Sequence, residues 1–106
     1  MTLLEKTILE QFKVLLRERL QVHKIILFGS RARGDADPQS DLDVVVVLDD
    51  DVDASARENV SDCAWEAGFV HGIVVVPVVF TRSEWDHGPE RQSLFVRAVE
   101  TEGVPV

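Results

Sequence analysis

Two short apolar runs separated by a polar turn constrain the fold of this chain more than any other feature. The first run covers residues 25–28 and ends at Gly29-Ser30, and the second covers residues 44–48 and consists of Val and Leu. Runs of this length and composition are typical of buried β-strands, while the Gly, Pro, Asp and Ser residues between them are typical of a loop. The sequence therefore predicts a core built on a small β-sheet.

The rest of the chain supplies helices and one further strand. Thr2 and Glu5 have the spacing of a capping box, and apolar residues follow at helical intervals. The predicted helices cover residues 3–20, 53–67 and 89–102, with single helical turns at 30–33 and after a second capping-box pattern at 81–84. The predicted strands cover residues 24–28, 42–48 and 73–80. Pro77 inside the last strand indicates a sheet edge or a bulge, because proline cannot donate to a sheet ladder.

Glycines and apolar faces predict how the helices end and pack. Gly34, Gly68 and Gly103 follow helical patterns and are expected to end them. The expected inward residues are Val60, Cys63, Ala64 and Ala67 in the middle helix, and Leu94, Phe95, Ala98 and Val99 in the last one. The third strand is apolar throughout, so we expect it to be buried on both faces. The order of elements indicates an α/β sandwich, with residues 1–106 forming one domain.

Composition narrows the class of protein further. Hydrophobic residues make up 45% of the 106 residues, enough for one small core, and no apolar stretch reaches the roughly 18 residues of a membrane span. The single cysteine, Cys63, excludes an internal disulfide and fits a reducing cytoplasm. The net charge of −8 argues against a general nucleic-acid binder, which needs basic surface. We expect a cytoplasmic protein whose large partner is a more basic protein; self-association into a homo-oligomer stays open.

Acidic residues and a Gly-Ser pair flank the polar turn. Asp41 and Asp43 occupy alternate positions at the start of the second strand, so their side chains point to one face. Mg²⁺ prefers oxygen ligands, and metal ions held by carboxylates can clamp a reacting phosphate. Gly29 permits close backbone approach to a triphosphate, and Ser30 adds a hydroxyl. We therefore expect catalytic and metal-binding roles for Asp41 and Asp43, and roles in binding a nucleotide triphosphate for Gly29, Ser30, Arg31 and Arg33.

Each part of this pattern also has a simpler interpretation. A Gly-Ser pair after a strand is usually only a turn, and an Asp-x-Asp at a strand start is more often solvated than bound to metal. Arg31 and Arg33 could face solvent rather than phosphate. The combination of a strand, Gly-Ser, ten residues, Asp-x-Asp and a second strand is much more specific than its parts. Trp65 and Trp85 could each anchor a partner, although burial in the core is an equal alternative.

The segments at residues 29–34 and 40–43 resemble, residue for residue, the signature of the nucleotidyltransferase superfamily that includes DNA polymerase beta and kanamycin nucleotidyltransferase. The whole chain resembles the minimal nucleotidyltransferases, stand-alone catalytic domains of about this size. The resemblance implies a small mixed β-sheet with helices mainly on one side, and Mg²⁺-dependent transfer of a nucleoside monophosphate, with ATP as the expected donor. It also implies pairing with a HEPN-domain toxin, for which such a chain acts as antitoxin, in some cases by attaching AMP to the toxin.

One departure from the family pattern bears on activity. The family places a third carboxylate on the later strand, near position 74, where this chain has Val74. The nearest acids, Glu84 and Asp86, lie beyond that strand. Two interpretations therefore stay open: an active nucleotidyltransferase, or a catalytically lapsed module that restrains a HEPN-domain partner by contact alone.

Overall fold

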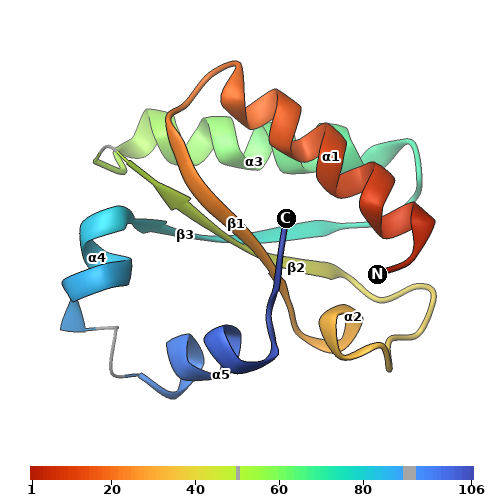
Figure 1. Ribbon diagram of the computed structural model, residues 1–106. Coiled ribbons are helices and arrows are strands. Elements are labelled where there is room, and N and C mark those ends of the chain that lie inside the picture. Colours follow the sequence, from red (N-terminus) through yellow and green to blue (C-terminus); the bar gives the residue numbers. More distant parts are fainter. Residues whose placement is uncertain (50, 90–92) are drawn as a thin grey trace.

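Helices and strands alternate in a layered α/β fold in the computed structural model, which describes residues 1–49, 51–89 and 93–106 (Figure 1). The helices are α1 (Leu3–Arg17), α2 (Ser30–Arg33), α3 (Ala54–Phe69), α4 (Arg82–His87) and α5 (Leu94–Glu102). The strands are β1 (Val22–Phe28), β2 (Leu42–Leu48), β3 (Val75–Thr81) and β4 (Val104–Pro105). The capping box predicted for α1 forms, because the Glu5 amide donates to Thr2 Oγ1 and the Thr2 amide donates to Glu5 Oε1.

The strands of the described residues pair in the order β3-β2-β1-β4, so β2 and β1 are central. β1 runs antiparallel to β2 and to β4, whereas β2 runs parallel to β3, which makes the sheet mixed. The parallel register extends from Leu42, which pairs with Val75, to Leu48, which pairs with Thr81. Parallel strands cannot be joined by a tight turn, and α3 forms the crossover between them. Pro77 therefore lies on an edge strand, one of the two positions that the sequence indicated.

Helices cover both faces of the sheet, but the two long helices share one face (Figure 1). α1 and α3 pack over the face whose buried side chains include Leu27 and Val44. α4 and α5 lie across the opposite face, where Val45 packs with Phe80 and Trp85. β2 is consequently buried on both faces along most of its length. No helix in the described residues is long and apolar enough to cross a membrane.

The last helix differs from its prediction in both its start and its inward face. α5 begins at Leu94 after the Ser93 cap, rather than at residue 89, and residues 90–92 of that prediction lie outside the described residues. Leu94 and Ala98 are exposed, so their predicted inward positions are wrong. Val99 packs in the second cluster, as predicted, and Val96, which was not predicted to face inward, packs there too. Phe95 is 37% exposed, and its ring contacts the rings of Phe28 and Phe80 at the edge of this cluster.

The third strand is shorter and more exposed than predicted. β3 begins at Val75 rather than at Ile73, and residues 76–79 are only half-buried. The apolar run suggested burial on both faces, and this prediction is wrong. An edge strand has a strand neighbour on one side only, so parts of its side chains reach solvent.

Gly68 does not end α3, as the sequence suggested, but lies inside its last turn. The helix continues to Phe69, with Val70 as its cap. A Cβ added at Gly68 would overlap the carbonyl oxygen of Ile73, whose own amide donates to the Gly68 carbonyl at 3.2 Å. Gly68 therefore allows the chain at Ile73 to pass close to the helix. The residue with a positive φ in the turn that follows is Gly72 (67°).

Gly68→Ala should destabilise the fold by about 1–3 kcal/mol, since the new methyl group overlaps backbone that is held by hydrogen bonds. Gly72→Asn is the control, because that site has open space and asparagine tolerates a positive φ. Urea unfolding followed by circular dichroism measures both variants. Equal stability of Gly68→Ala and the native chain would show that the connection between α3 and β3 can open at little cost.

Candidate functional site

The Gly29-Ser30 turn lies directly against the start of β2. Gly29 follows the last residue of β1 and takes φ 77° and ψ −158°, a conformation that residues with a Cβ rarely adopt. A Cβ on Gly29 would also lie 2.8 Å from Asp43 Oδ2, closer than side chains normally approach. The backbone conformation therefore requires glycine at this position, and a larger residue would also displace the Asp43 carboxylate. The chain then enters α2 at Ser30, which is half-buried.

Asp41 and Asp43 lie on either side of Leu42, the first residue of β2. Leu42 is fully buried in the core under α1 and α3, so alternation along the chain directs both carboxylates to the opposite face. Asp43 pairs across the sheet with Phe28, the last residue of β1, and this pairing brings its carboxylate beside Gly29. Asp41 is exposed and Asp43 is half-buried. The acid pair and the Gly-Ser turn thus lie side by side.

The electrostatics of the acid pair fit a bound cation. Burial raises the pKa of Asp43 above its ordinary value, and the negative charge of Asp41 raises the pKa further. In the described part of the chain no Lys, Arg or His forms an ion pair with either carboxylate. A divalent cation between the two acids would remove this repulsion, so the donor set and its charge suit a metal-binding role.

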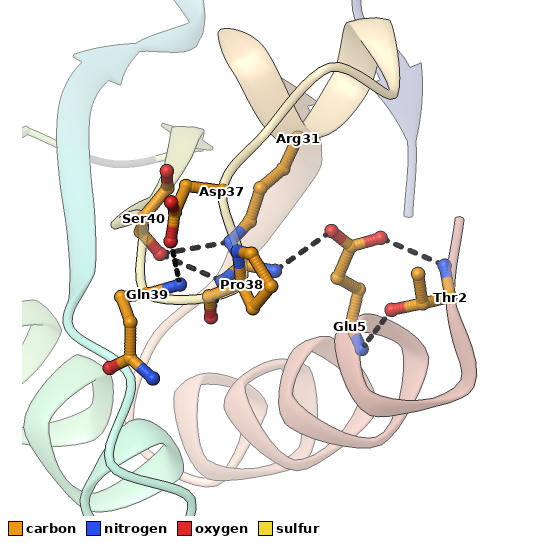
Figure 2. Close-up of polar contacts among 7 residues, drawn as sticks. All are labelled: Thr2, Glu5, Arg31, Asp37, Pro38, Gln39 and Ser40. Atoms are coloured by element: carbon orange, nitrogen blue, oxygen red, sulfur yellow. Dashed lines mark hydrogen bonds and ion pairs between the residues drawn. The ribbon is translucent and has the colours of Figure 1, made fainter.

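Arg31 is buried between α1 and the loop that follows α2 (Figure 2). Its Nε and Nη2 donate to the Ser40 carbonyl at 3.0 and 2.8 Å, and Nη2 also donates to the Pro38 carbonyl at 3.0 Å. Its Nη1 forms an ion pair with Glu5 Oε2 at 3.1 Å. This placement argues against the ATP-binding role expected for Arg31, because most of its donors are already bound within the protein.

Arg33 lies two residues after Arg31, at the end of α2, and is exposed. Its Nε is 3.4 Å from Asp35 Oδ2, and its Nη1 is 3.7 Å from Glu102 Oε2. Exposed ion pairs of this kind contribute little to stability, so they can yield to a phosphate group. Arg33 is therefore free to turn toward a ligand, whereas Arg31 is not.

Valine occupies both positions where a third carboxylate could join the acid pair. Asp43 pairs with Val76 in the parallel register, and the Val74 carbonyl accepts from the Leu42 amide at 2.9 Å. Val74 and Val76 alternate with the buried Val75, so both share the face of the carboxylates. The described residues contain no group of three or more His, Cys, Asp or Glu residues able to hold a metal. Val76 rather than Val74 is the residue directly opposite Asp43.

Glu5 is the residue in this region that sequence reasoning missed. Its spacing from Thr2 predicted only a helix cap, yet its second oxygen binds Arg31. Burial alone would raise the pKa of Glu5, but hydrogen bonds from the Thr2 backbone and from Arg31 outweigh burial, and the pKa is lowered. A signal was available, because Glu5 lies in phase with the apolar stripe of Ile8 and Phe12 and therefore faces the core.

An exposed apolar surface lies where the end of α3 meets the start of β3, and we call it the α3–β3 surface. It consists of Trp65 and Phe69, whose rings stack with centroids 4.5 Å apart, and of Val74, which is 61% exposed. These residues line a hollow of about 430 Å³ that Pro77 also borders. Of the two tryptophans considered as partner anchors, Trp65 is at the surface, whereas Trp85 is buried.

Comparisons with known proteins identify the family. A model of the nucleotidyltransferase domain matches residues 9–99, so the chain belongs to this family of transferases. A relative from Methanocaldococcus jannaschii, provisionally named a protein adenylyltransferase, is 27% identical over 103 residues, which cover 93% of this chain and 95% of the relative. A toxin–antitoxin structure with AMP-PNP gives a TM-score of 0.61 at 26% identity, over 95% of this chain and 70% of that chain. A mutant of the MntA–HpeT toxin–antitoxin complex gives 0.60 at 25% identity, over 92% and 69%.

Asp43→Asn should stabilise the metal-free chain at neutral pH. The reason is that the ionised carboxylate of Asp43 is less favourable in the folded protein than in the unfolded chain. Between the ordinary aspartate pKa of 3.8 and the raised pKa, the folded protein binds more protons than the unfolded chain. The free energy of unfolding therefore falls as the pH rises through this range.

Thermal unfolding without divalent ions measures this effect across acidic and neutral pH. The gain from Asp43→Asn should be full above the raised pKa and should vanish below the ordinary one. Asp51→Asn, an exposed acid elsewhere, is the control. A gain of the same size for both variants would contradict the account of the acid pair.

Proposed function

We propose that this chain is a Mg²⁺-dependent nucleotidyltransferase that moves AMP from ATP to a protein, as the antitoxin of a pair with a HEPN-domain toxin. One observation carries the proposal: the carboxylate of Asp43 lies against Gly29, so the acid pair adjoins the Gly-Ser turn. Nucleotidyl transfer depends on positioning a triphosphate and neutralising its charge. The Gly-Ser turn would position the triphosphate, and a cation held by the acid pair would neutralise its charge at the same place.

The residues of the site have distinct roles in this proposal. Asp41 and Asp43 would hold Mg²⁺, which prefers carboxylate oxygens and, when bound, neutralises charge and polarises a phosphoryl oxygen. The repulsion that raises the pKa of Asp43 supports this role, because a cation relieves it. Gly29 and Ser30 would hold the triphosphate, and Arg33 would neutralise part of its charge.

The reaction forms a bond between a hydroxyl oxygen of the acceptor protein and the α-phosphorus of ATP. The bond from that phosphorus to the β-phosphate breaks, pyrophosphate leaves, and the hydroxyl proton passes to water. Water is the expected proton acceptor because Val74 and Val76 stand where a third carboxylate would lie. A missing group that acts mainly in the transition state lowers turnover more than substrate affinity, so transfer is expected to be slow.

Three further findings support the acceptor, the partner and the location. The M. jannaschii relative is provisionally named a protein adenylyltransferase, and both structural neighbours are toxin–antitoxin complexes, one of them with AMP-PNP. The net charge of −8 disfavours a polynucleotide acceptor. The single cysteine, Cys63, is free and buried, which fits a cytoplasmic protein.

ATP binding should depend on Mg²⁺ and on the acid pair. Calorimetric titration should give measurable affinity for the native chain with Mg²⁺, and affinity weaker by about tenfold or more without Mg²⁺ or in Asp41→Asn/Asp43→Asn. Glu10→Gln/Asp51→Asn removes two exposed acids elsewhere and is the charge-matched control. The intact mass of a co-expressed HEPN-domain protein from the same genome should rise by one or more AMP groups. Equal ATP affinity under all conditions would refute the site assignment.

A second function, restraint of the partner by contact alone, is favoured by the α3–β3 surface. Its exposed aromatic pair offers an anchor for a protein, and valines stand beside the acid pair where a third carboxylate would support catalysis. An exposed acidic stripe on α3, Glu58, Asp62 and Glu66, flanks this surface. Such a stripe would repel a second copy of this chain and attract a partner segment with apolar and basic residues.

The two functions give opposite results in cells that express a HEPN-domain toxin. If transfer protects the cells, Asp41→Asn/Asp43→Asn should lose protection while it still co-purifies with the toxin. If contact alone protects, that variant should protect fully, and Trp65→Ser/Phe69→Ser should lose both protection and co-purification. Leu94→Ser, which changes an exposed apolar residue on α5, is the control for surface hydrophobicity.

A further inference from the structure

A pair of buried charges, Glu5 and Arg31, has no role in the chemistry described above. They are the only charged residues in the described part of the chain that are buried, with exposed fractions of 4% and 7%. The attraction within a buried ion pair seldom exceeds its desolvation cost, and apolar residues of similar size are often as stable. Stability alone therefore does not explain why Glu5 and Arg31 are buried against the loop that leads into Asp41.

Arg31 holds the loop that leads into Asp41. Its guanidinium group donates to the carbonyls of Pro38 and Ser40 at 2.8–3.0 Å (Figure 2). Ser40 directly precedes Asp41, so its carbonyl belongs to the peptide group that enters Asp41. The Ser40 amide donates to the Asp37 carbonyl at 2.9 Å, which closes the turn. Residues 35–40 form neither helix nor strand, so these hydrogen bonds determine the path of the loop.

Glu5 holds the guanidinium group from the opposite side. Its Oε2 accepts from Arg31 Nη1 at 3.1 Å, while its Oε1 accepts from the Thr2 amide at 2.8 Å. Because Glu5 lies in the first turn of α1, the pair connects that helix to the loop. A lysine in place of Arg31 could keep the charge, but it could not reach two carbonyls and a carboxylate with one planar group.

The geometry points to Glu5 and Arg31 as positioning residues for Asp41, which they hold in the orientation that metal binding requires. This inference rests on the proposed function, because it concerns the same acid pair. The effect passes through the Ser40 carbonyl, and neither side chain contacts the metal or the nucleotide. Loss of either residue should loosen the loop and lower metal affinity while the rest of the fold stays intact.

The two capping boxes of the chain provide a matched test. Thr81 and Glu84 cap α4 as Thr2 and Glu5 cap α1, but no arginine pairs with Glu84 in the described residues. Glu5→Gln and Glu84→Gln each retain one side-chain oxygen that can cap the helix and remove one charge. Arg31→Lys is the third variant. The measurements are Mn²⁺ affinity by calorimetry, well below the melting temperature, and amide hydrogen exchange along the chain.

Glu5→Gln and Arg31→Lys should each weaken Mn²⁺ binding by about tenfold or more and speed exchange at residues 39–42. Glu84→Gln should change neither. A purely structural role would lower the melting temperature with Mn²⁺ affinity unchanged, and this result would overturn the inference. If the native chain binds no Mn²⁺, the proposed function fails. The inference is then tested by hydrogen exchange alone, and unchanged exchange at residues 39–42 in Glu5→Gln and Arg31→Lys would overturn it. Should Arg31→Lys fail to fold, the isosteric Glu5→Gln decides.

Discussion

The pairing of β1 with β2 is the constraint on which the candidate site depends. Phe28 opposite Asp43 brings the turn after β1 against the acid at the start of β2. Because side chains alternate along a strand, a slip of one residue would turn both carboxylates under α1 and α3 and expose Leu42. Burial of β2 on both faces opposes such a slip, so the packing of the apolar core also aligns the acids with the turn.

Several features of this end of the sheet cost folding free energy. Gly29 loses more conformational freedom on folding than other residues do, the pKa of Asp43 is raised, and Glu5 and Arg31 are charged groups removed from water. Features of this kind gather at functional sites, while the remaining structure supplies the compensating stability. Here the compensation comes from the apolar clusters on the two faces of the sheet. These unfavourable features gather around Asp41 and the Gly-Ser turn, as expected if this end of the sheet is a binding site.

The sequence predicted the parts of the fold and site that depend on local spacing. The confirmed predictions are the α/β class, both capping boxes and the edge position of Pro77. Arg31 and Arg33 could not be told apart, because their surroundings depend on α1 and on the loop rather than on α2 itself. Val76 could not be placed opposite Asp43 from the sequence. The whole of α3 separates β2 from β3 in the chain, so no local pattern determines how the two strands align. The burial of Trp85 and the exposure of Trp65 likewise depend on which helices cover the sheet.

Anomalous diffraction from crystals grown with Mn²⁺ and a non-hydrolysable ATP analogue tests the central claim most directly. The account predicts a manganese peak at coordinating distance from the carboxylates of Asp41 and Asp43, with the triphosphate on the Gly29-Ser30 backbone. It also predicts that Arg31 keeps its bonds to the Pro38 and Ser40 carbonyls in that complex. A nucleotide bound in the hollow beside Trp65, with no manganese at the acid pair, would contradict the account.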